Sequence, residues 1–171
     1  MKIDHLLAVS LGTIVGLTAC SSDQKEEVRK PNILILLADD AGYADFGFMG
    51  SADIQTPNID RLAAEGRIFT DAHVAATVSS PSRSMMLTGR YGQRYGYECN
   101  LDKPGDGIPD DEELLPALLK RYGYRTGCIG KWHLGSEPSQ RPNAKGFDTF
   151  YGLLAGHRSY FYDPETSDKD G

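Results

Sequence analysis

The sequence predicts an α/β fold with a mainly parallel central sheet, because apolar strand-like segments alternate with helical segments. Residues 32–38 read Asn-Ile-Leu-Ile-Leu-Leu-Ala, a continuous apolar run typical of a parallel strand buried on both faces. Residues 126–132 predict a second core strand. The helical patterns that lie between these two runs complete the alternation.

The segment after the first strand predicts a short helix over residues 56–66. Thr56 is a suitable N-cap, Pro57 fits the first helical position, and Gly66 fits a left-handed stop. Residues 67–74 then predict a short strand.

Two further helices are predicted, over residues 81–87 and 112–122. In the second, apolar side chains recur at helical spacing, at Leu114, Leu115, Leu118, Leu119 and Tyr122. Pro116 lies near the first turn, where its missing N–H is tolerated, and Gly123 ends the helix.

Charge and composition exclude one class of partner. The 171 residues carry a net charge of −6 and contain no run rich in Lys or Arg. Tyrosines and arginines alternate over residues 90–97, but without a basic stripe we interpret this segment as scaffold. No nucleic-acid partner is expected.

The N-terminus predicts an exported lipoprotein. Residues 6–17 form an apolar run of signal-peptide length, too short to span a bilayer. Residues 17–20, Leu-Thr-Ala-Cys, resemble a bacterial lipobox, in which the chain is cut before Cys20 and Cys20 is acylated. We therefore expect a lipoprotein signal peptide at 1–19, an acylated cysteine and flexible tether at 20–30, and the folded domain at 31–171. A simple secretory peptide is the alternative.

This reading places the protein in the bacterial envelope, in the periplasm or at the outer membrane or cell surface. Its only expected membrane contact is the lipid anchor. Cys99 and Cys128 are the remaining cysteines. They could pair in an oxidising compartment, but the position of Cys128 in a predicted core strand favours an inert buried thiol.

Polar residues are expected to converge at one edge of the sheet. Asp39 and Asp40 follow the first strand, Lys131 and His133 stand at the end of the second, and Ser79 lies at a helix N-terminus. Paired carboxylates suit calcium or magnesium, although aspartates in this position can also simply cap a turn.

Three segments carry a family resemblance. Residues 79–83, Ser-Ser-Pro-Ser-Arg, continuing into Leu-Thr-Gly-Arg at 87–90, resemble the signature of formylglycine-dependent (type I) sulfatases in its serine variant. Residues 37–43, Leu-Ala-Asp-Asp-Ala-Gly-Tyr, resemble the family's first metal segment, and residues 130–135, Gly-Lys-Trp-His-Leu-Gly, match a third. The resemblance implies an alkaline-phosphatase-like α/β sandwich. Residues 31–171 would then be the N-terminal part of a truncated catalytic domain.

The resemblance also implies a mechanism. Ser79 would be oxidised to formylglycine, whose hydrate carries two hydroxyls on one carbon, one to attack sulfur and one to expel sulfate. Arg83 would hold this hydroxyl and the metal ligands, Lys131 would place a cation on the sulfate, and His133 would be the base.

Family members also bind one calcium ion. Here Asp39, Asp40 and the oxygen of residue 79 would be its ligands. The later Asp and Asn of the family have no match in the chain, so the ligand set is incomplete.

The expected activity is hydrolysis of sulfate esters, with a sulfated carbohydrate as substrate and a maturation enzyme that oxidises Ser79 as partner. His157 is expected to contact the sugar and Tyr160 or Phe161 to stack on it, although these aromatics could equally pack the core. His73 is expected to be structural. Two alternatives remain open: a phosphatase or phosphoryl transferase of the same superfamily, and a non-catalytic glycan-binding surface lipoprotein.

Overall fold

The structure is a computed structural model that describes residues 29–100, 103 and 105–159. The predicted signal peptide, Cys20, Tyr160 and Phe161 lie outside the described residues. None of the helices in the described ranges is long and apolar enough to cross a bilayer.

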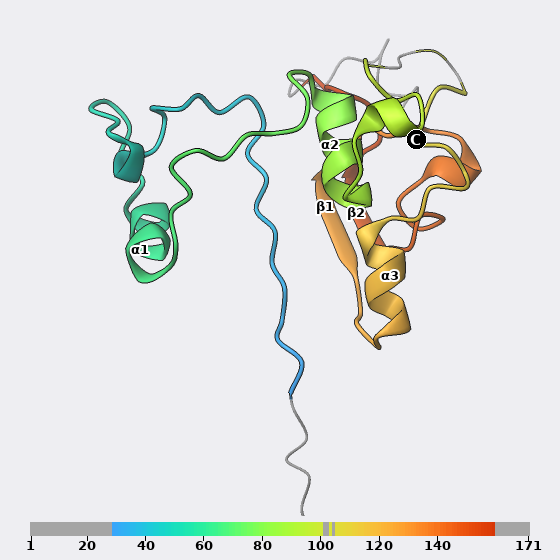
Figure 1. The fold of residues 1–171 in the computed structure, drawn as a ribbon, viewed down its shortest axis with the longest axis horizontal. Helices are drawn as coiled ribbons and strands as arrows, with labels where there is room; N and C mark the ends of the chain where they lie inside the picture. The colour runs from blue at the N-terminus through green and yellow to red at the C-terminus, as the bar shows by residue number, and fades with distance from the viewer. Residues whose placement is uncertain (1–28, 101–102, 104, 160–171) are drawn as a thin grey trace, which may run out of the picture. The chain divides into compact units, whose positions relative to one another are not determined.

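The described residues form an α/β arrangement, as predicted, and Figure 1 shows the paired strands β1 and β2 side by side. In chain order the elements are η1 (Gly47–Met49), α1 (Pro57–Glu65), α2 (Ser79–Thr88), η2 (Gly92–Arg94), α3 (Leu115–Arg121), β1 (Gly127–Lys131), η3 (Pro138–Gln140) and β2 (Thr149–Leu153). The η elements are single turns of 3₁₀ helix.

The two strands pair in parallel, in a register that runs from Gly127 opposite Thr149 to Lys131 opposite Leu153. A parallel pair requires a long connection, and residues 132–148 provide it. Side chains alternate between the two faces of the sheet: Ile129 and Tyr151 are exposed, whereas Cys128 and Phe150 face the core. Strand β2 was not predicted from the sequence.

A small core forms where the sheet, α2 and the long connection meet. Its fully buried members are Tyr97, Ile108, Leu114, Trp132 and Leu134. Trp132 packs edge-on against Phe147, with ring centroids 6.1 Å apart, and its indole N–H donates to the carbonyl of Gln140 at 3.0 Å. This core fixes Trp132, and therefore the two residues on either side of it that carry chemistry.

Cys99 and Cys128, the cysteines in the described part of the chain, are free thiols. Cys99 is exposed, whereas Cys128 is half-buried beside the core, and burial raises the pKa of its thiol. The structure therefore supports the interpretation of Cys128 as an inert thiol.

The prediction of a strand at residues 32–38 is wrong, since the structure has no strand there. Its apolar side chains stand in solvent, with Leu34 82% and Leu36 73% exposed. A parallel strand exists only through hydrogen bonds to its neighbours, and no strand in the described part of the chain pairs with this segment.

The predicted strand at residues 67–74 is also wrong. The segment is irregular and exposed, and it is held by side-chain contacts: the hydroxyl of Tyr43 donates to the carbonyl of Thr70 at 2.9 Å, and His73 pairs with Asp71 at 2.7 Å. With no neighbouring strand to pair with, its apolar residues do not form a ladder.

The predicted helices are present, but their ends differ, and proline explains two of the starts. In α2 the first helical bond runs from the N–H of Ser82 to the carbonyl of Val78, so Pro81 is third in the helix, where no N–H is needed. In α3 the helix cannot begin at residue 112, because Pro116 has no N–H to donate four residues back.

Gly123 ends its helix as predicted, Gly89 ends α2 without having been predicted to do so, and Gly66 differs from its prediction. Gly89 and Gly123 adopt left-handed conformations, with φ of 65° and 79°, after α2 and α3. Gly66 ends α1 at φ −110° and ψ −148°, so its predicted left-handed stop is wrong.

Candidate active site

The site begins on one face of α2. Ser79 is the first residue of the helix, and Arg83 follows one turn later on the same side. The guanidinium Nε of Arg83 donates to Ser79 Oγ at 3.3 Å, one terminal nitrogen donates to the Lys131 carbonyl at 2.7 Å, and the other donates to Asp39 Oδ1 at 3.1 Å. Arg83 thus connects all three segments that the sequence singled out.

Asp39 is the acidic centre of the site. Lys131 Nζ lies 3.1 Å from Asp39 Oδ2 and 3.3 Å from Oδ1, and Arg83 bonds the same carboxylate. Partial burial by itself raises the pKa of Asp39, but the hydrogen bonds and charges of Lys131 and Arg83 outweigh it and hold the pKa below its usual value. Asp39 therefore stays ionised.

His133 enters the site from the end of β1. Its ring Nδ1 lies 3.2 Å from Ser79 Oγ, within hydrogen-bond reach. Its backbone N–H donates to the carbonyl of Leu154 at 2.9 Å, which extends the parallel pairing past β1 and β2. The hydroxyl of Ser79 is therefore flanked by an imidazole and a guanidinium.

The structure brings together the predicted Asp39, Ser79, Arg83, Lys131 and His133. Ser79 also stands where α2 presents its free N–H groups and the positive end of its dipole. A hydroxyl with a base beside it, two cations nearby and a helix N-terminus is an arrangement suited to nucleophilic attack on an anionic group.

The donor set fits a hard cation in part. A carboxylate offers about four acceptor sites, and Arg83 and Lys131 use three of those on Asp39, so one remains on Oδ2. Asp40 follows in the left-handed region, at φ 55°. Across the described residues, however, no three acidic, His or Cys side chains gather into a metal-binding group.

Two predicted residues lie outside this arrangement. His157 is exposed in the irregular chain after β2, and His73 is exposed with Asp71 as its partner. Gly156, the residue before His157, lies against the site, because a Cβ placed on it would come within 2.6 Å of the His133 ring.

Sequence reasoning missed a set of supporting contacts behind the helix. Ser80 Oγ donates to the carbonyl of His133 at 2.7 Å and lies 2.7 Å from the hydroxyl of Tyr97. The amide oxygen of Asn100 accepts from the N–H of Ser80 at 3.0 Å, so it caps α2 from outside the helix. Only the position of Ser80 inside the signature could have drawn attention to it.

The residues of segment 90–97 have scaffold roles. Tyr97 is fully buried, the hydroxyl of Tyr95 lies 2.6 Å from Ser84 Oγ, and Arg90 pairs with the buried carboxylate of Glu112 while lying over the ring of Tyr95. These contacts agree with the interpretation of the segment as scaffold.

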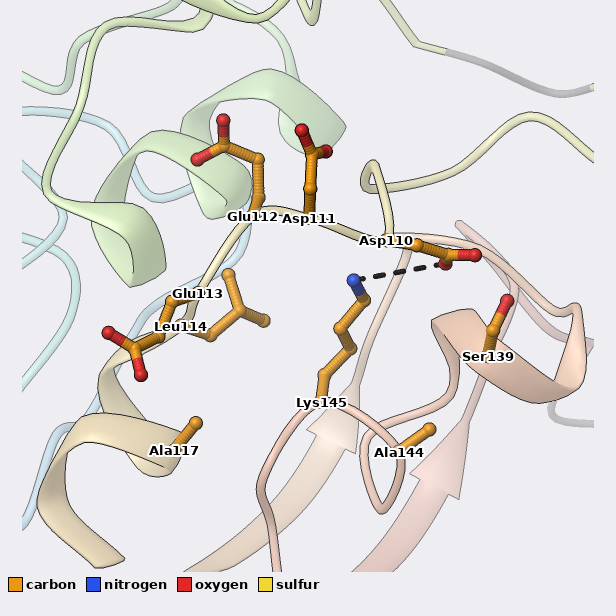
Figure 2. A pocket seen from close by; sticks show the side chains of 9 residues that line it. All are labelled: Asp110, Asp111, Glu112, Glu113, Leu114, Ala117, Ser139, Ala144 and Lys145. Atoms are coloured by element: carbon orange, nitrogen blue, oxygen red, sulfur yellow. Dashed lines mark ion pairs between the residues drawn. The ribbon is translucent and has the colours of Figure 1, made fainter. Parts of the chain in front are cut away.

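A pocket of about 460 Å³ lies elsewhere, between the chain that leads into α3 and the turn after η3. Figure 2 shows Lys145 pointing toward Asp110 across it, at 3.9 Å, and the Lys145 ammonium also donates to the Pro109 carbonyl at 2.6 Å. Burial lowers the pKa of Lys145. Four consecutive acidic residues, 110–113, line the pocket, and such a lining disfavours an anionic substrate.

Comparison with known proteins identifies the class to which this fold and site belong. The sulfatase family model matches residues 31–170. Arylsulfatase G of Canis lupus familiaris is 40% identical over 158 residues, which cover 92% of this chain and 30% of that protein. N-acetylgalactosamine-6-sulfatase of Homo sapiens is 46% identical over 131 residues, covering 71% of this chain and 25% of that protein.

Solved structures agree. The structure of Ps i-CgsB in complex with k-i-k-neocarrahexaose superposes with a TM-score of 0.75 at 48% identity, over 80% of this chain and 32% of that chain. The structure of BT4656 with D-glucosamine-2-N,6-O-disulfate gives a TM-score of 0.64 at 36% identity, over 75% of this chain and 24% of that chain.

The chain belongs to the sulfatase family, and its α/β arrangement is part of the alkaline-phosphatase-like fold of these relatives. It spans about 30% of the length of the relatives that it matches.

Proposed function

We propose that the protein acts in the hydrolysis of sulfate esters of carbohydrates, with residue 79 as the nucleophile. The observation that carries this proposal is the placement of Ser79 Oγ between Arg83 Nε and His133 Nδ1 at the N-terminus of α2. The carbohydrate class is supported by relatives whose names include N-acetylgalactosamine-6-sulfatase and by neighbours solved with neocarrahexaose and a glucosamine disulfate.

Each side chain has a role that its contacts support. If Ser79 is oxidised to formylglycine, its hydrate supplies two hydroxyls on one carbon, one for attack and one for release of sulfate. Arg83 orients the oxygen of residue 79, and His133 Nδ1 holds or accepts a proton at that oxygen. Lys131 pairs with the same Asp39 carboxylate as Arg83, so its ammonium can turn to the oxygens of a bound sulfate.

Mass spectrometry of the peptide that contains Ser79, isolated from the native host, tests the nucleophile. We expect a loss of two hydrogen atoms, which marks oxidation of the alcohol to the aldehyde by a maturation enzyme. An intact serine in active protein would contradict the proposal.

Side-by-side assays test the reaction class. We expect the matured protein to hydrolyse an aryl sulfate but not an aryl phosphate, and Ser79→Ala to abolish turnover. Hydrolysis of the phosphate alone would indicate a phosphatase. Binding of a sulfated glycan without any turnover would indicate a glycan-binding protein.

We also propose that Asp39, Asp40 and residue 79 contribute to a calcium site, to which the ion would bring charge neutralisation at the sulfate oxygens. Calcium should then raise the melting temperature of the wild-type protein, because a ligand that binds the folded state stabilises it. Asp40→Asn should remove this increase, whereas Asp53→Asn, at an exposed aspartate, should keep it. Equal increases in both variants would contradict the site.

The envelope location rests on Cys20, and we propose that its acylation anchors the protein. Cells fed labelled palmitate should label the wild type and Cys99→Ser but not Cys20→Ser. Label retained in Cys20→Ser would exclude the lipobox reading.

A further inference from the structure

His133 has a backbone conformation that its surroundings must impose. Its φ of 58° lies in the left-handed region, and within the described chain only Asp40 shares this feature among non-glycine residues. Such a conformation persists in a histidine only where neighbouring contacts hold it. In this conformation the ring Nδ1 lies 3.2 Å from Ser79 Oγ.

The carbonyl of His133 is held by a buried serine. Ser80 Oγ donates to it at 2.7 Å, and the side chain of Ser80 is fully buried. Since a carbonyl cannot donate, the single proton of Ser80 is committed to His133, and Tyr97 must donate its own proton to Ser80 Oγ. The chain of donors therefore runs from Tyr97 through Ser80 to the backbone of His133.

The ring of His133 is limited from the other side by a glycine. A Cβ on Gly156 would lie 2.6 Å from both Cε1 and Nε2 of the ring, closer than side-chain atoms approach one another. The N–H of His133 is fixed at the same time by the carbonyl of Leu154. Its carbonyl, its N–H and its ring thus each meet a different neighbour.

We infer that Ser80 and Gly156 are positioning residues for His133, and that Tyr97 acts through Ser80. Ser80 fixes the turn that aims the imidazole at residue 79, and the missing side chain of Gly156 leaves room for the ring. The catalytic meaning of this placement rests on the proposed function, whereas the placement itself does not.

The helix provides a matched control. Ser84 lies one turn after Ser80, is equally buried, and bonds the hydroxyl of Tyr95 at 2.6 Å, but it has no bond to His133. Ser84→Ala therefore removes the same kind of buried serine–tyrosine contact as Ser80→Ala. A general loss of stability should appear in both variants, whereas loss of His133 positioning should appear only in Ser80→Ala.

The test is NMR of the full chain with labelled histidine, which reports the placement of the ring without any need for turnover. In the wild type we expect nuclear Overhauser contacts from the His133 ring to Gly156 and Ser79. Ser80→Ala and Gly156→Ala should lose the contact to Ser79 and shift the ring resonances, whereas Ser84→Ala and Ser80→Thr should keep both. Unchanged contacts in Ser80→Ala and Gly156→Ala would overturn the inference.

A second readout separates this inference from the proposed function. Sulfate-ester turnover is measured per molecule of converted residue 79, counted by mass spectrometry so that an effect on maturation does not enter. A misplaced base should lower kcat of Ser80→Ala by about 10-fold to 100-fold. KM should change little, and Ser80→Thr should restore the rate. If the wild type shows no turnover, the proposed function fails, while the NMR contacts still decide the positioning role.

Discussion

Arg83 joins three segments that are far apart in the sequence. Its five N–H donors lie in a fixed planar fork, and they reach Ser79, Asp39 and the carbonyl of Lys131 at once. Its side chain is only 12% exposed, so these bonds are shielded from competing water. A lysine has one charged nitrogen at the end of a flexible chain and could replace only part of this set.

Arg83→Lys should therefore lower the free energy of unfolding by about 1–3 kcal/mol, since the part-buried Ser79 hydroxyl and Lys131 carbonyl lose a donor. Arg121→Lys is the control, because Arg121 pairs with Glu113 in solvent, with the arginine side chain 61% exposed. Arg121→Lys should lower the free energy of unfolding by less than about 0.5 kcal/mol. Urea unfolding of both variants measures the difference, and equal losses would contradict the structural role of Arg83.

At the scale of elements, one carboxylate ties together α3 and the starts of both strands. Asp148 precedes β2, pairs with Lys120 of α3 at 2.8 Å, and accepts from the N–H of Thr126, just before β1, at 2.7 Å. The bond from Lys120 is the main cause that lowers the pKa of Asp148 to about 2, with the Thr126 N–H next. The contact sets the register at which the two strands begin.

This pKa predicts acid sensitivity. The folded-state pKa lies below the unfolded value of about 3.9, so the contribution of Asp148 is present above about pH 4 and is lost as the pH falls toward 2. Asp148→Asn should be less stable than the wild type at pH 6, and the difference should shrink by pH 2. Thermal unfolding at several pH values measures it, and a difference that does not vary with pH would refute the assignment.

Local signals predicted part of this fold. The helices α2 and α3 and strand β1 follow from proline, glycine and apolar spacing within a few residues, and their ends at Gly89 and Gly123 obey the same chemistry. The meeting of Ser79 with Lys131 and His133 could also be predicted, because it depends on where α2 begins and β1 ends. Asp39 joins them without the strand that was predicted to place it. The left-handed turn at His133 and the role of Ser80 could not, since both depend on tertiary contacts between residues more than 50 apart.

At the scale of the whole molecule, the apolar run at residues 33–37 stands out. It has the composition of a core strand, yet all five side chains are exposed. A β-prone apolar stretch with unpaired backbone groups is a ready site for pairing with another strand. The same sequence that predicts a buried strand therefore marks an exposed and unpaired part of the described chain.

Hydrogen exchange tests this description. Amides in residues 33–37 should exchange at close to the unprotected rate, because no backbone bond in the described structure satisfies them. The amides of Trp132 and His133, bonded to the carbonyls of Leu153 and Leu154 at 2.9 Å, should be protected. Strong protection in residues 33–37 would show that the segment is paired in solution.

Two faces of α2 make different contacts, and this limits which sequence changes the helix tolerates. Ser79 and Arg83 face the site, and Ser80 and Ser84 face the tyrosines behind it. Each residue advances an α-helix by about 100°, so one inserted or deleted residue after Ser79 would rotate everything downstream by more than a quarter of a turn. Arg83 would leave the site, and a serine would lose its tyrosine. Point substitutions in this helix are therefore far easier to accommodate than a change in its length.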